Sequence, residues 1–219
     1  MGSQSDQITW RDGGVPVSTR FDDPFFSLED GVAETRHVFL GGNDLPARFC
    51  DGFHVAELGF GTGLNFLVTL QAFRAAGCGG QLRFTSFEAF PLAMQDLHTA
   101  LGAFDGLPDD LARAATFPEH LSGDDFDLHV ILGDARETLP AWDGAADAWF
   151  LDGFSPAKNP ELWSEDLMHA VGTHTAPRGT VATYTAAGFV RRALAAAGFD
   201  VQRTQGYGRK RHMTRAALP

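Results

Sequence analysis

The chain has 219 residues, of which 44% are hydrophobic and 21% charged. This composition predicts one globular domain and excludes a wholly disordered chain. No apolar run approaches the ~18–20 residues of a membrane-spanning helix, and the first ten residues lack the basic and apolar segments of a secretory signal. Two cysteines, Cys50 and Cys78, are too few for a disulfide scaffold or a four-thiolate zinc site. We therefore expect a cytoplasmic protein with no membrane contact.

Charge is distributed unevenly along the chain. The net charge is −11, yet residues 188–219 contain seven basic residues and a single acid, Asp200. That segment has a charge of +6, and residues 1–187 have −17. A basic segment attracts a polyanion and an acidic body repels one. On charge alone, a solvated basic face is the favoured explanation of the segment.

The first fifty residues are predicted to form an extension that packs on the core. Between residues 8 and 26, short apolar pieces alternate with turn signals such as Asp12-Gly13-Gly14, which is typical of a small hairpin and loop. From residue 29 to 49 the apolar spacing is closer to helical, with a break at Asn43-Asp44. We expect residues 1–50 to form this extension and residues 51–219 to form the main domain.

From residue 53 onward, strands and helices alternate. The predicted strands are residues 53–58, 82–88, 128–132, 146–151 and 180–184, and the predicted helices are 64–76, 92–101, 162–171 and 189–197. A loop-rich insertion covers residues 106–125, and residues 199–218 are predicted to form two strands. The repeated strand–helix units indicate an α/β fold with a mostly parallel sheet, helices on both faces and an antiparallel C-terminal strand pair.

A glycine-rich loop, Gly59-Phe60-Gly61-Thr62-Gly63, joins the first strand of the main domain to its helix. Its glycines allow a tight turn and the close approach of a ligand to the start of that helix, where Asn65 lies. The spacing is not the G-x-G-x-x-G of a dinucleotide site. Glu57, two residues before the loop, would repel a pyrophosphate and attract a cation. The favoured ligand is S-adenosylmethionine (SAM), and a purely structural turn is the alternative.

Acidic residues also end the next two strands. Glu88 ends the second strand, where a carboxylate can accept hydrogen bonds from both ribose hydroxyls. Asp134, followed by Ala135, ends the third strand, where it can accept a hydrogen bond from the adenine amino group. Acids at three successive strand ends lie on the edge where open parallel sheets bind ligands, and they predict a nucleoside site.

The segment Asp152-Gly153-Phe154-Ser155-Pro156 ends the fourth strand. At this position in a SAM enzyme, a carboxylate can orient an amine acceptor, and an aromatic ring can stack on a base or flank the sulfonium. We predict Asp152 and Phe154 as catalytic residues, with Asp152 also contacting the cofactor; an Asx-turn with Phe154 in the core is the alternative. The eight histidines show no metal-binding spacing, and neither Ser155 nor the cysteines lie in a nucleophile motif, so we expect no metal site and no covalent nucleophile.

These stretches resemble the methyltransferase domain of the MnmC-type family, which makes 5-methylaminomethyl-2-thiouridine at the tRNA wobble position. The segments that resemble it are residues 21–27, 34–43 with Arg48, 57–66, 147–160 with Trp163, and the ending at 187–192 and 206–211. The motif Asp-Gly-Phe-x-Pro-x-Lys-Asn-Pro at residues 152–160 is long enough to be specific. The resemblance extends over nearly the whole chain.

The resemblance implies a class I SAM-dependent methyltransferase that methylates 5-aminomethyluridine in tRNA, with the wobble base splayed from the anticodon loop and stacked on an aromatic ring. Larger family members add an FAD-dependent oxidase domain, and this sequence has no second glycine fingerprint for FAD. We therefore expect methyl transfer alone, by a monomer, on an amine that another enzyme supplies. The candidate tRNA-binding residues are Lys158, Arg191, Arg192, Arg209, Lys210 and Arg211.

Three other functions stay open at this point. One is a SAM-dependent methyltransferase for a small amine or a protein, which has no need of the basic segment. Another is a non-catalytic SAM-fold module that binds RNA or a partner, which the presence of Glu57, Glu88 and Asp152 disfavours. The third is an NAD-dependent reductase, which the loop spacing and Glu57 disfavour.

Overall fold

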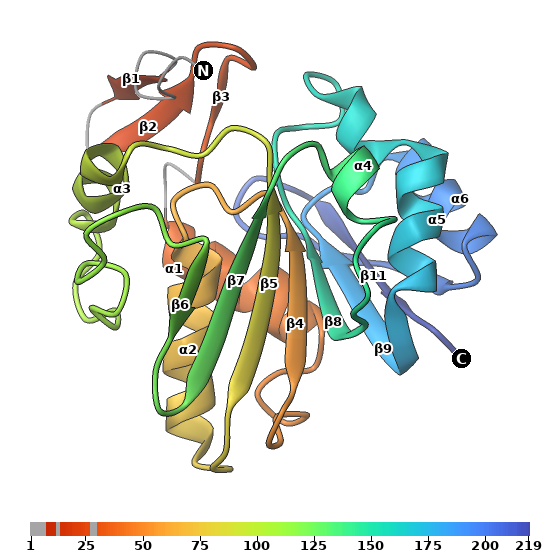
Figure 1. Cartoon of the computed structure of the whole chain (residues 1–219). Coiled ribbons are helices and arrows are strands. Elements are labelled where there is room, and N and C mark those ends of the chain that lie inside the picture. The colour runs from red at the N-terminus through yellow and green to blue at the C-terminus, as the bar shows by residue number, and fades with distance from the viewer. Residues whose placement is uncertain (1–7, 12–13, 27–29) are drawn as a thin grey trace.

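The structure, a computed structural model, describes residues 8–11, 14–26 and 30–219. Its centre is an eight-stranded sheet with the order β10-β11-β9-β8-β4-β5-β7-β6 (Figure 1). The parallel strands are β4 (His54–Leu58), β5 (Leu82–Glu88), β7 (Phe126–Leu132), β8 (Ala146–Leu151) and β9 (Thr175–Thr183). Their carboxyl ends meet at the upper edge of the sheet in Figure 1.

Antiparallel strands close both sides of the sheet. β11 (His212–Ala217) pairs antiparallel with β9 and with β10 (Asp200–Gln205). At the other side, β6 (His120–Ser122) pairs antiparallel with β7. The predicted α/β fold with an antiparallel C-terminal strand pair is confirmed.

Helices cover both faces of the sheet (Figure 1). One face packs against α1 (Gly31–Thr35), the π-helix η2 (Arg36–Gly41) and α2 (Leu64–Ala76), and the other against α4 (Ala135–Thr138), α5 (Glu165–Thr173) and α6 (Gly188–Ala196). The alternating side chains of β8 illustrate this arrangement. Phe150 belongs to the same hydrophobic core as α2, whereas Trp149 and Leu151 belong to the core beneath α5 and α6. Because both of its faces are buried, β8 is apolar at every position except Asp147.

The N-terminal residues lie across the upper edge of the sheet. β1 (Ile8–Arg11), β2 (Val15–Ser18) and β3 (Asp23–Pro24) form a small antiparallel sheet there, next to α3 (Met94–Leu101) (Figure 1). The chain then enters α1 and η2, whose buried residues join the core of the main sheet. Part of the predicted turn at residues 12–14 lies outside the described residues. The boundary between residues 1–50 and 51–219 stays a prediction.

α2, β5 and β8 have the predicted bounds, and most other long elements differ from the prediction by one to three residues; β9 begins at Thr175, five residues before its predicted start. β6, α4 and the 3-10 helix η3 (Pro160–Trp163) are not among the predicted elements, because three or four residues are too few to show a periodicity. α5 begins at Glu165 rather than residue 162, since the Ser164 hydroxyl accepts a hydrogen bond from Leu167 N (3.3 Å) and caps the helix there. Within the described ranges, none of the helices is long and apolar enough to cross a membrane.

Candidate active site

A cavity of about 910 Å³ opens at the upper edge of the sheet, beneath the N-terminal strands. It lies where β4 and β8 are neighbours, the point at which the strand order reverses and open α/β sheets bind ligands. Most of the residues predicted to bind the cofactor line it. They are Gly59, Phe60, Gly61, Thr62, Asn65, Glu88, Asp134, Ala135 and Asp152.

The glycine loop has a backbone that only glycine adopts easily. Gly59, Gly61 and Gly63 have φ angles of +88°, +55° and +76°. A Cβ on Gly59 would lie 3.4 Å from Gly153 Cα, and one on Gly63 would lie 2.5 Å from Leu111 Cδ1. The loop therefore fits between the end of β8 and the insertion. Gly59 and Gly61 line the cavity, whereas Gly63 lies behind it and starts α2.

Glu88 is fixed at the end of β5 by backbone amides. Its carboxylate accepts hydrogen bonds from Gly61 N (3.0 Å) and Phe90 N (2.6 Å). Burial raises the pKa of Glu88, and these hydrogen bonds oppose the rise. A carboxylate has more acceptor positions than two amides use, so Glu88 can still accept hydrogen bonds from ribose hydroxyls.

Asp134 differs from Glu88, because a cation already neutralises it. Its side chain caps α4, accepting a hydrogen bond from Arg136 N (2.9 Å), and the Arg136 guanidinium lies 2.5 Å from Oδ2. The hydrogen bonds from this arginine lower the pKa of Asp134. Asp134 and Ala135 line the cavity, but the carboxylate has less capacity left for a ligand than that of Glu88.

Asn65 joins two carboxylates beneath the glycine loop. Its Nδ2 donates to Glu57 Oε1 (2.7 Å) and to Asp152 Oδ2 (2.8 Å), and its Oδ1 accepts from Thr35 Oγ1 (2.7 Å). Glu57 is fully buried, also accepts from Ser86 Oγ (2.8 Å), and does not line the cavity. Glu57 was predicted to face a cationic ligand; the structure instead places it behind Asn65.

Asp152 lines the cavity, and its surroundings raise the pKa of its carboxyl group. Burial raises the pKa of Asp152 to about 6, and hydrogen bonds from Gly153 N (2.8 Å) and Asn65 oppose the rise. The charge of Glu34 raises the pKa further, and that of Lys210 lowers it. A cation bound in the cavity would favour the ionised form of Asp152.

Two further polar side chains line the cavity and were not predicted. Glu34, from α1, accepts a hydrogen bond from Lys210 Nζ (2.8 Å), which also lies 4.0 Å from the centre of the Tyr184 ring. Tyr184 donates its hydroxyl to Gly153 O (2.8 Å), and burial raises the pKa of this phenol. Two features of the sequence could have indicated these residues as part of the site. Tyr184 is at the end of a predicted strand, and Glu34 is in a segment that resembles the family.

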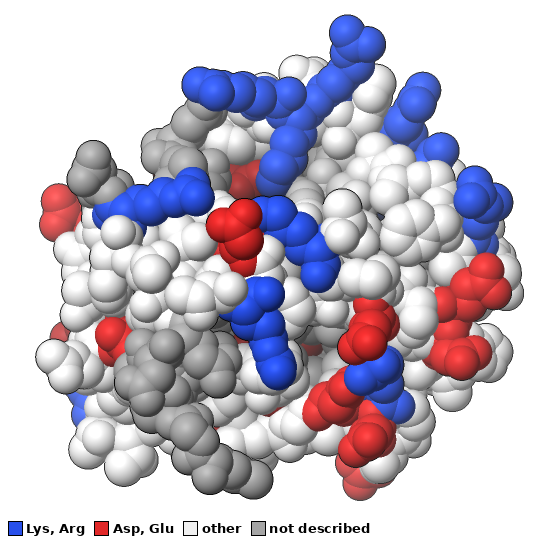
Figure 2. All heavy atoms as spheres, turned by 90° about the horizontal axis from the view of Figure 1, so that it is seen from above, with Lys and Arg blue, Asp and Glu red and all other residues white. Residues whose placement is uncertain are grey.

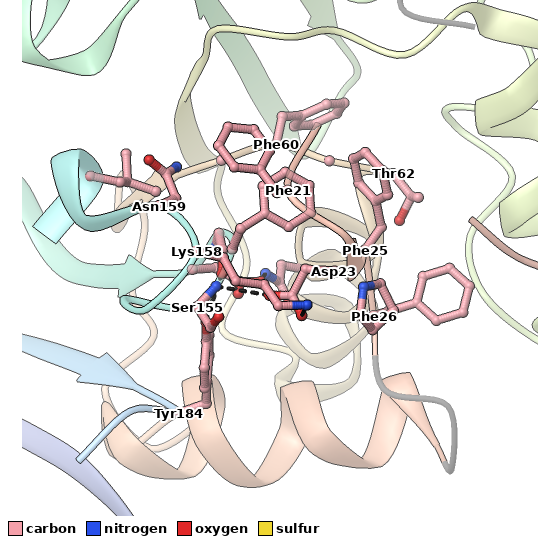
Figure 3. Close-up of a pocket in the computed structure, with 18 of the residues that line it drawn as sticks. Phe21, Asp23, Phe25, Phe26, Phe60, Thr62, Ser155, Lys158, Asn159 and Tyr184 are labelled. Carbon is pink, nitrogen blue, oxygen red and sulfur yellow. Dashed lines mark hydrogen bonds and ion pairs between the residues drawn. The ribbon is translucent and has the colours of Figure 1, made fainter. Parts of the chain in front are cut away.

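Aromatic side chains form a wall on one side of the cavity. Phe154 stacks on Phe21, with ring centres 4.6 Å apart, and meets the Phe25 ring edge-on at 5.1 Å. Phe21 in turn meets Phe90 edge-on at 5.7 Å. Figure 3 shows Phe21, Phe25 and Phe60 grouped in the cavity, above Asp23, Ser155 and Lys158. Phe154 therefore lies at the cavity and not in the hydrophobic core.

Basic side chains surround the mouth of the cavity. Figure 2, seen from above, shows that Lys and Arg side chains lie across the centre and upper half of this face, with most of the visible acids toward the lower right. The basic residues that line the cavity are Arg20, Arg136, Lys158, Arg209 and Lys210. The candidate tRNA contacts are thus divided: Lys158, Arg209 and Lys210 line the cavity, whereas Arg191, Arg192 and Arg211 do not.

The basic C-terminal segment is not one continuous basic surface. Arg215 forms an ion pair with Asp44 (2.6 Å), and Lys210 forms one with Glu34. Arg191, on α6, is half-buried. The charge of +6 therefore overstates what this segment presents at the cavity.

The strand order and the place of the cavity define a class I SAM-dependent methyltransferase fold. The site also fits SAM: Glu88 is a buried, fixed acceptor for a ribose, the loop presents glycine backbone to the ligand, and Asp152 is a buried carboxylate suited to a cation. Residues 108–219 match the model of the S-adenosyl-L-methionine-dependent methyltransferase family. The chain belongs to this family, and SAM is its cofactor.

Proteins with similar sequences show which members of the family this chain resembles. The tRNA 5-methylaminomethyl-2-thiouridine biosynthesis bifunctional proteins MnmC of Aeromonas salmonicida and Pseudomonas aeruginosa are each 45% identical to this chain, over 225 and 232 residues. The matches cover 93% and 96% of this chain and 34% of each relative, so the chain spans about a third of their length. The family resemblance of the motifs is confirmed.

Solved structures agree with this relationship. MnmC2 from Aquifex aeolicus matches with a TM-score of 0.74 and 26% identity, over 97% of this chain and 70% of that chain. Precorrin-6Y C5,15-methyltransferase from Geobacter metallireducens shares the fold at 14% identity, with a TM-score of 0.52 over 99% of this chain and 98% of that chain.

Proposed function

We propose that this chain transfers a methyl group from SAM to the primary amine of 5-aminomethyluridine, with or without a 2-thio group, at the wobble position of tRNA. The product is 5-methylaminomethyluridine in the same state of thiolation. The observation that carries the proposal is a cavity with carboxylates inside, an aromatic wall, and basic side chains around its mouth. The names of relatives at 45% identity, which refer to 5-methylaminomethyl-2-thiouridine in tRNA, support it.

The residues assigned to the cofactor lie at the ends of β4, β5 and β7. SAM supplies an electrophilic methyl group on a sulfonium. Glu88 would hold the ribose hydroxyls, and the backbone of Gly59 and Gly61 would hold the amino-acid part. The segment at Asp134 and Ala135 would lie along the adenine.

Asp152 and Glu34 are assigned to the acceptor amine. A primary amine of this kind is largely protonated in water near neutral pH, and the ammonium form has no lone pair with which to attack. The ionised Asp152 carboxylate can accept a hydrogen bond from the ammonium and then its proton. Glu34, on the same cavity, can hold a second N–H of the amine. Orientation of the lone pair toward the methyl group supplies most of the remaining rate enhancement.

The aromatic wall and the basic mouth are assigned to the RNA. Bases in single-stranded RNA are usually bound splayed out and stacked on aromatic side chains, and the stacked rings of Phe21 and Phe154 offer such a surface. Phosphates flanking the base would contact Lys158 and Arg209, since exposed cations at the mouth attract the RNA backbone.

Methyl transfer to defined tRNA tests the proposal. The purified chain is incubated with SAM carrying an isotopically labelled methyl group and with tRNA bearing 5-aminomethyluridine, and the nucleosides are analysed by mass spectrometry. Label should appear in 5-methylaminomethyluridine alone. Control substrates are the same tRNA with an unmodified wobble uridine and the free 5-aminomethyluridine nucleoside. Equal labelling of the unmodified tRNA would refute the amine as acceptor, and equally fast labelling of the free nucleoside would indicate a small-molecule enzyme.

A further inference from the structure

Three side chains that can ligate a metal meet on the outermost strand pair of the sheet. β6 pairs antiparallel with β7 so that His120 lies opposite His129, and Asp127 lies two residues before His129 on the same face. His120 Nε2 is 2.8 Å from Asp127 Oδ1, and His129 Nε2 is 3.2 Å from Asp127 Oδ2. The two imidazole rings stack with their centres 4.1 Å apart. None of the three residues lines the cavity.

The spacing of the donor atoms suits one small cation. One ligand atom from each residue lies within 4.8 Å of the other two. Zn²⁺ binds imidazole nitrogen and carboxylate oxygen at about 2.0–2.2 Å, so tetrahedral ligand atoms lie roughly 3.3–3.5 Å apart. The His129–Asp127 distance of 3.2 Å is close to this value, and the His120–Asp127 distance of 2.8 Å is shorter than it. Small side-chain rotations would therefore place all three donors around a single ion.

The chemistry and the exposure of the donors indicate the class of ion. Two imidazoles and one carboxylate suit zinc and its first-row neighbours better than Mg²⁺ or Ca²⁺, which prefer oxygen ligands alone. The side chains of His120 and His129 are 57% and 49% exposed, and that of Asp127 is 28% exposed. Water can therefore reach the remaining coordination position.

We propose that His120, Asp127 and His129 form a binding site for a divalent first-row transition metal, with Zn²⁺ as its best-fitting ion and water as a further ligand. A metal here fastens β6 to β7. The expectation of no metal site rested on spacing along the chain, and these residues converge only when the two strands pair.

A metal at this place would stabilise the insertion that ends at β6. Two residues of the insertion contact the glycine loop: Phe117 meets the Phe60 ring edge-on at 5.7 Å, and Leu111 packs where a Cβ on Gly63 would lie. β6 has only three residues, and its histidine is solvent-exposed. The site is structural: none of its three side chains lines the cavity.

Zinc titration of the full chain without any affinity tag tests the proposal. Isothermal calorimetry should show one zinc ion per chain, and His120→Asn or His129→Asn should each weaken binding by about tenfold or more. His169→Asn, at an exposed histidine of α5, is the matched control and should bind zinc like the wild type. Zinc should raise the melting temperature of the wild type and the control but not of His120→Asn.

The wild type alone provides a second measurement that does not depend on the variants' folding. Zinc should shift the imidazole NMR signals of His120 and His129 and leave those of the other histidines in place. Zinc binding that survives both substitutions, no binding at millimolar zinc, or shifts spread over the other histidines would overturn the proposal. SAM affinity and methyl transfer should be unchanged in the variants, so the failure of this site and the failure of the proposed function are distinguishable.

Discussion

The inside and the mouth of the cavity differ in the sign of their charge. Glu88 and Asp152 are carboxylates whose pKa values burial raises, whereas Arg20, Lys158 and Arg209 are exposed cations. Buried carboxylates with raised pKa values gain from a cation bound beside them, and exposed cations gain from phosphates. In the proposed function, the interior would hold the methyl donor and the amine, and the mouth would hold the RNA backbone.

Lys210 lies where the two regions meet. It forms an ion pair with Glu34, lies over the Tyr184 ring, and its charge lowers the pKa of Asp152. The mouth therefore acts on the interior through this side chain, and substitutions elsewhere in either region should affect mainly that region. The following substitutions test this separation.

The largest effect is expected inside the cavity, from Asp152→Asn. Asparagine keeps the size of the side chain and much of the hydrogen bonding but cannot take a proton from the amine. Methyl transfer to tRNA bearing 5-aminomethyluridine should slow by about 10²–10⁴-fold, measured in single turnover.

SAM binding and thermal melting of the same variant identify the reason for the slower reaction. The variant should still fold and bind SAM, with a somewhat lower melting temperature, because its single amide oxygen can accept from only one of the two donors, Asn65 Nδ2 and Gly153 N, which bond different oxygens of Asp152. Loss of SAM binding would assign Asp152 to the cofactor alone. A rate equal to that of the wild type would remove Asp152 from the mechanism.

The pH dependence should report the same carboxyl group. Since burial raises the pKa of Asp152 to about 6, the ionised fraction falls tenfold per pH unit below that value, and so should the rate. Bound SAM carries a positive charge, which favours the ionised form of Asp152. With SAM bound, the fall in rate should therefore begin at or below about pH 6. The folded state binds the proton more tightly than the unfolded chain, so the free energy of unfolding without SAM should fall as pH rises from about 4 to 6. Asp152→Asn should reduce the pH dependence of the unfolding free energy, to which Glu57 and Glu88 still contribute. Its slower rate should keep rising with pH through neutrality, because bulk solvent must then deprotonate the amine. A wild-type rate with the same pH profile as that of the variant would contradict the assignment.

Glu88 and Asp134 offer a comparison within the cofactor site. Glu88→Gln places an amide group against the N–H groups of Gly61 and Phe90 and should weaken SAM binding by about 1–3 kcal/mol. Asp134→Asn should cost less than about 1 kcal/mol, because the carboxylate already pairs with Arg136. Calorimetry with SAM measures both affinities. Equal reductions in affinity would show that Asp134 holds the adenine as strongly as Glu88 holds the ribose.

At the mouth, the expected change is in the salt dependence of tRNA binding. The double variant Lys158→Ala/Arg209→Ala should reduce the log–log salt slope by roughly 1.4 units, about 0.7 for each single-stranded phosphate that the protein no longer neutralises. The matched control Arg191→Ala/Arg192→Ala removes the same charge from α6, away from the cavity, and should leave the slope nearly unchanged. A larger reduction of the salt slope in Arg191→Ala/Arg192→Ala than in Lys158→Ala/Arg209→Ala would place the RNA on α6. SAM affinity should be unaffected in either pair.

The parts of the site that follow from strand ends were predictable from the sequence. The glycine loop, Glu88 and Asp152 each follow a strand whose apolar run is visible, and carboxyl ends of parallel strands meet at one edge. Phe21 and Glu34 lie in segments that resemble the family, but the strand pattern does not predict them as site residues, because more than a hundred residues separate them from Asp152 and the packing of the N-terminal segment brings them there. Short elements such as α4 leave no periodic signal.

Glu57 is the residue whose predicted role differs most from its position. Side chains alternate along β4, so Ala56 and Leu58 pack in the core beneath α5 and α6. Glu57 points to the opposite face, where α2 begins and Asn65 donates to it. Sequence position two residues before a glycine loop does not reveal this, since the direction of the side chain depends on the strand register.

The smallest effect is therefore expected from Glu57→Gln. Burial, and then the charge of Asp152, raise the pKa of Glu57 well above its usual value, so replacing the acid by a neutral amide removes little. Glutamine keeps the size of the side chain and an oxygen that accepts from Asn65, and the Ser86 hydroxyl, which donates to Glu57 in the structure, can turn to accept from the new amide group. SAM affinity should change by less than about threefold. Glu57→Leu, which leaves Asn65 and Ser86 without this partner, should instead lower the free energy of unfolding by about 1–3 kcal/mol. If Glu57→Gln reduced SAM affinity as much as Glu88→Gln, Glu57 would contact the cationic ligand directly, as the sequence predicted.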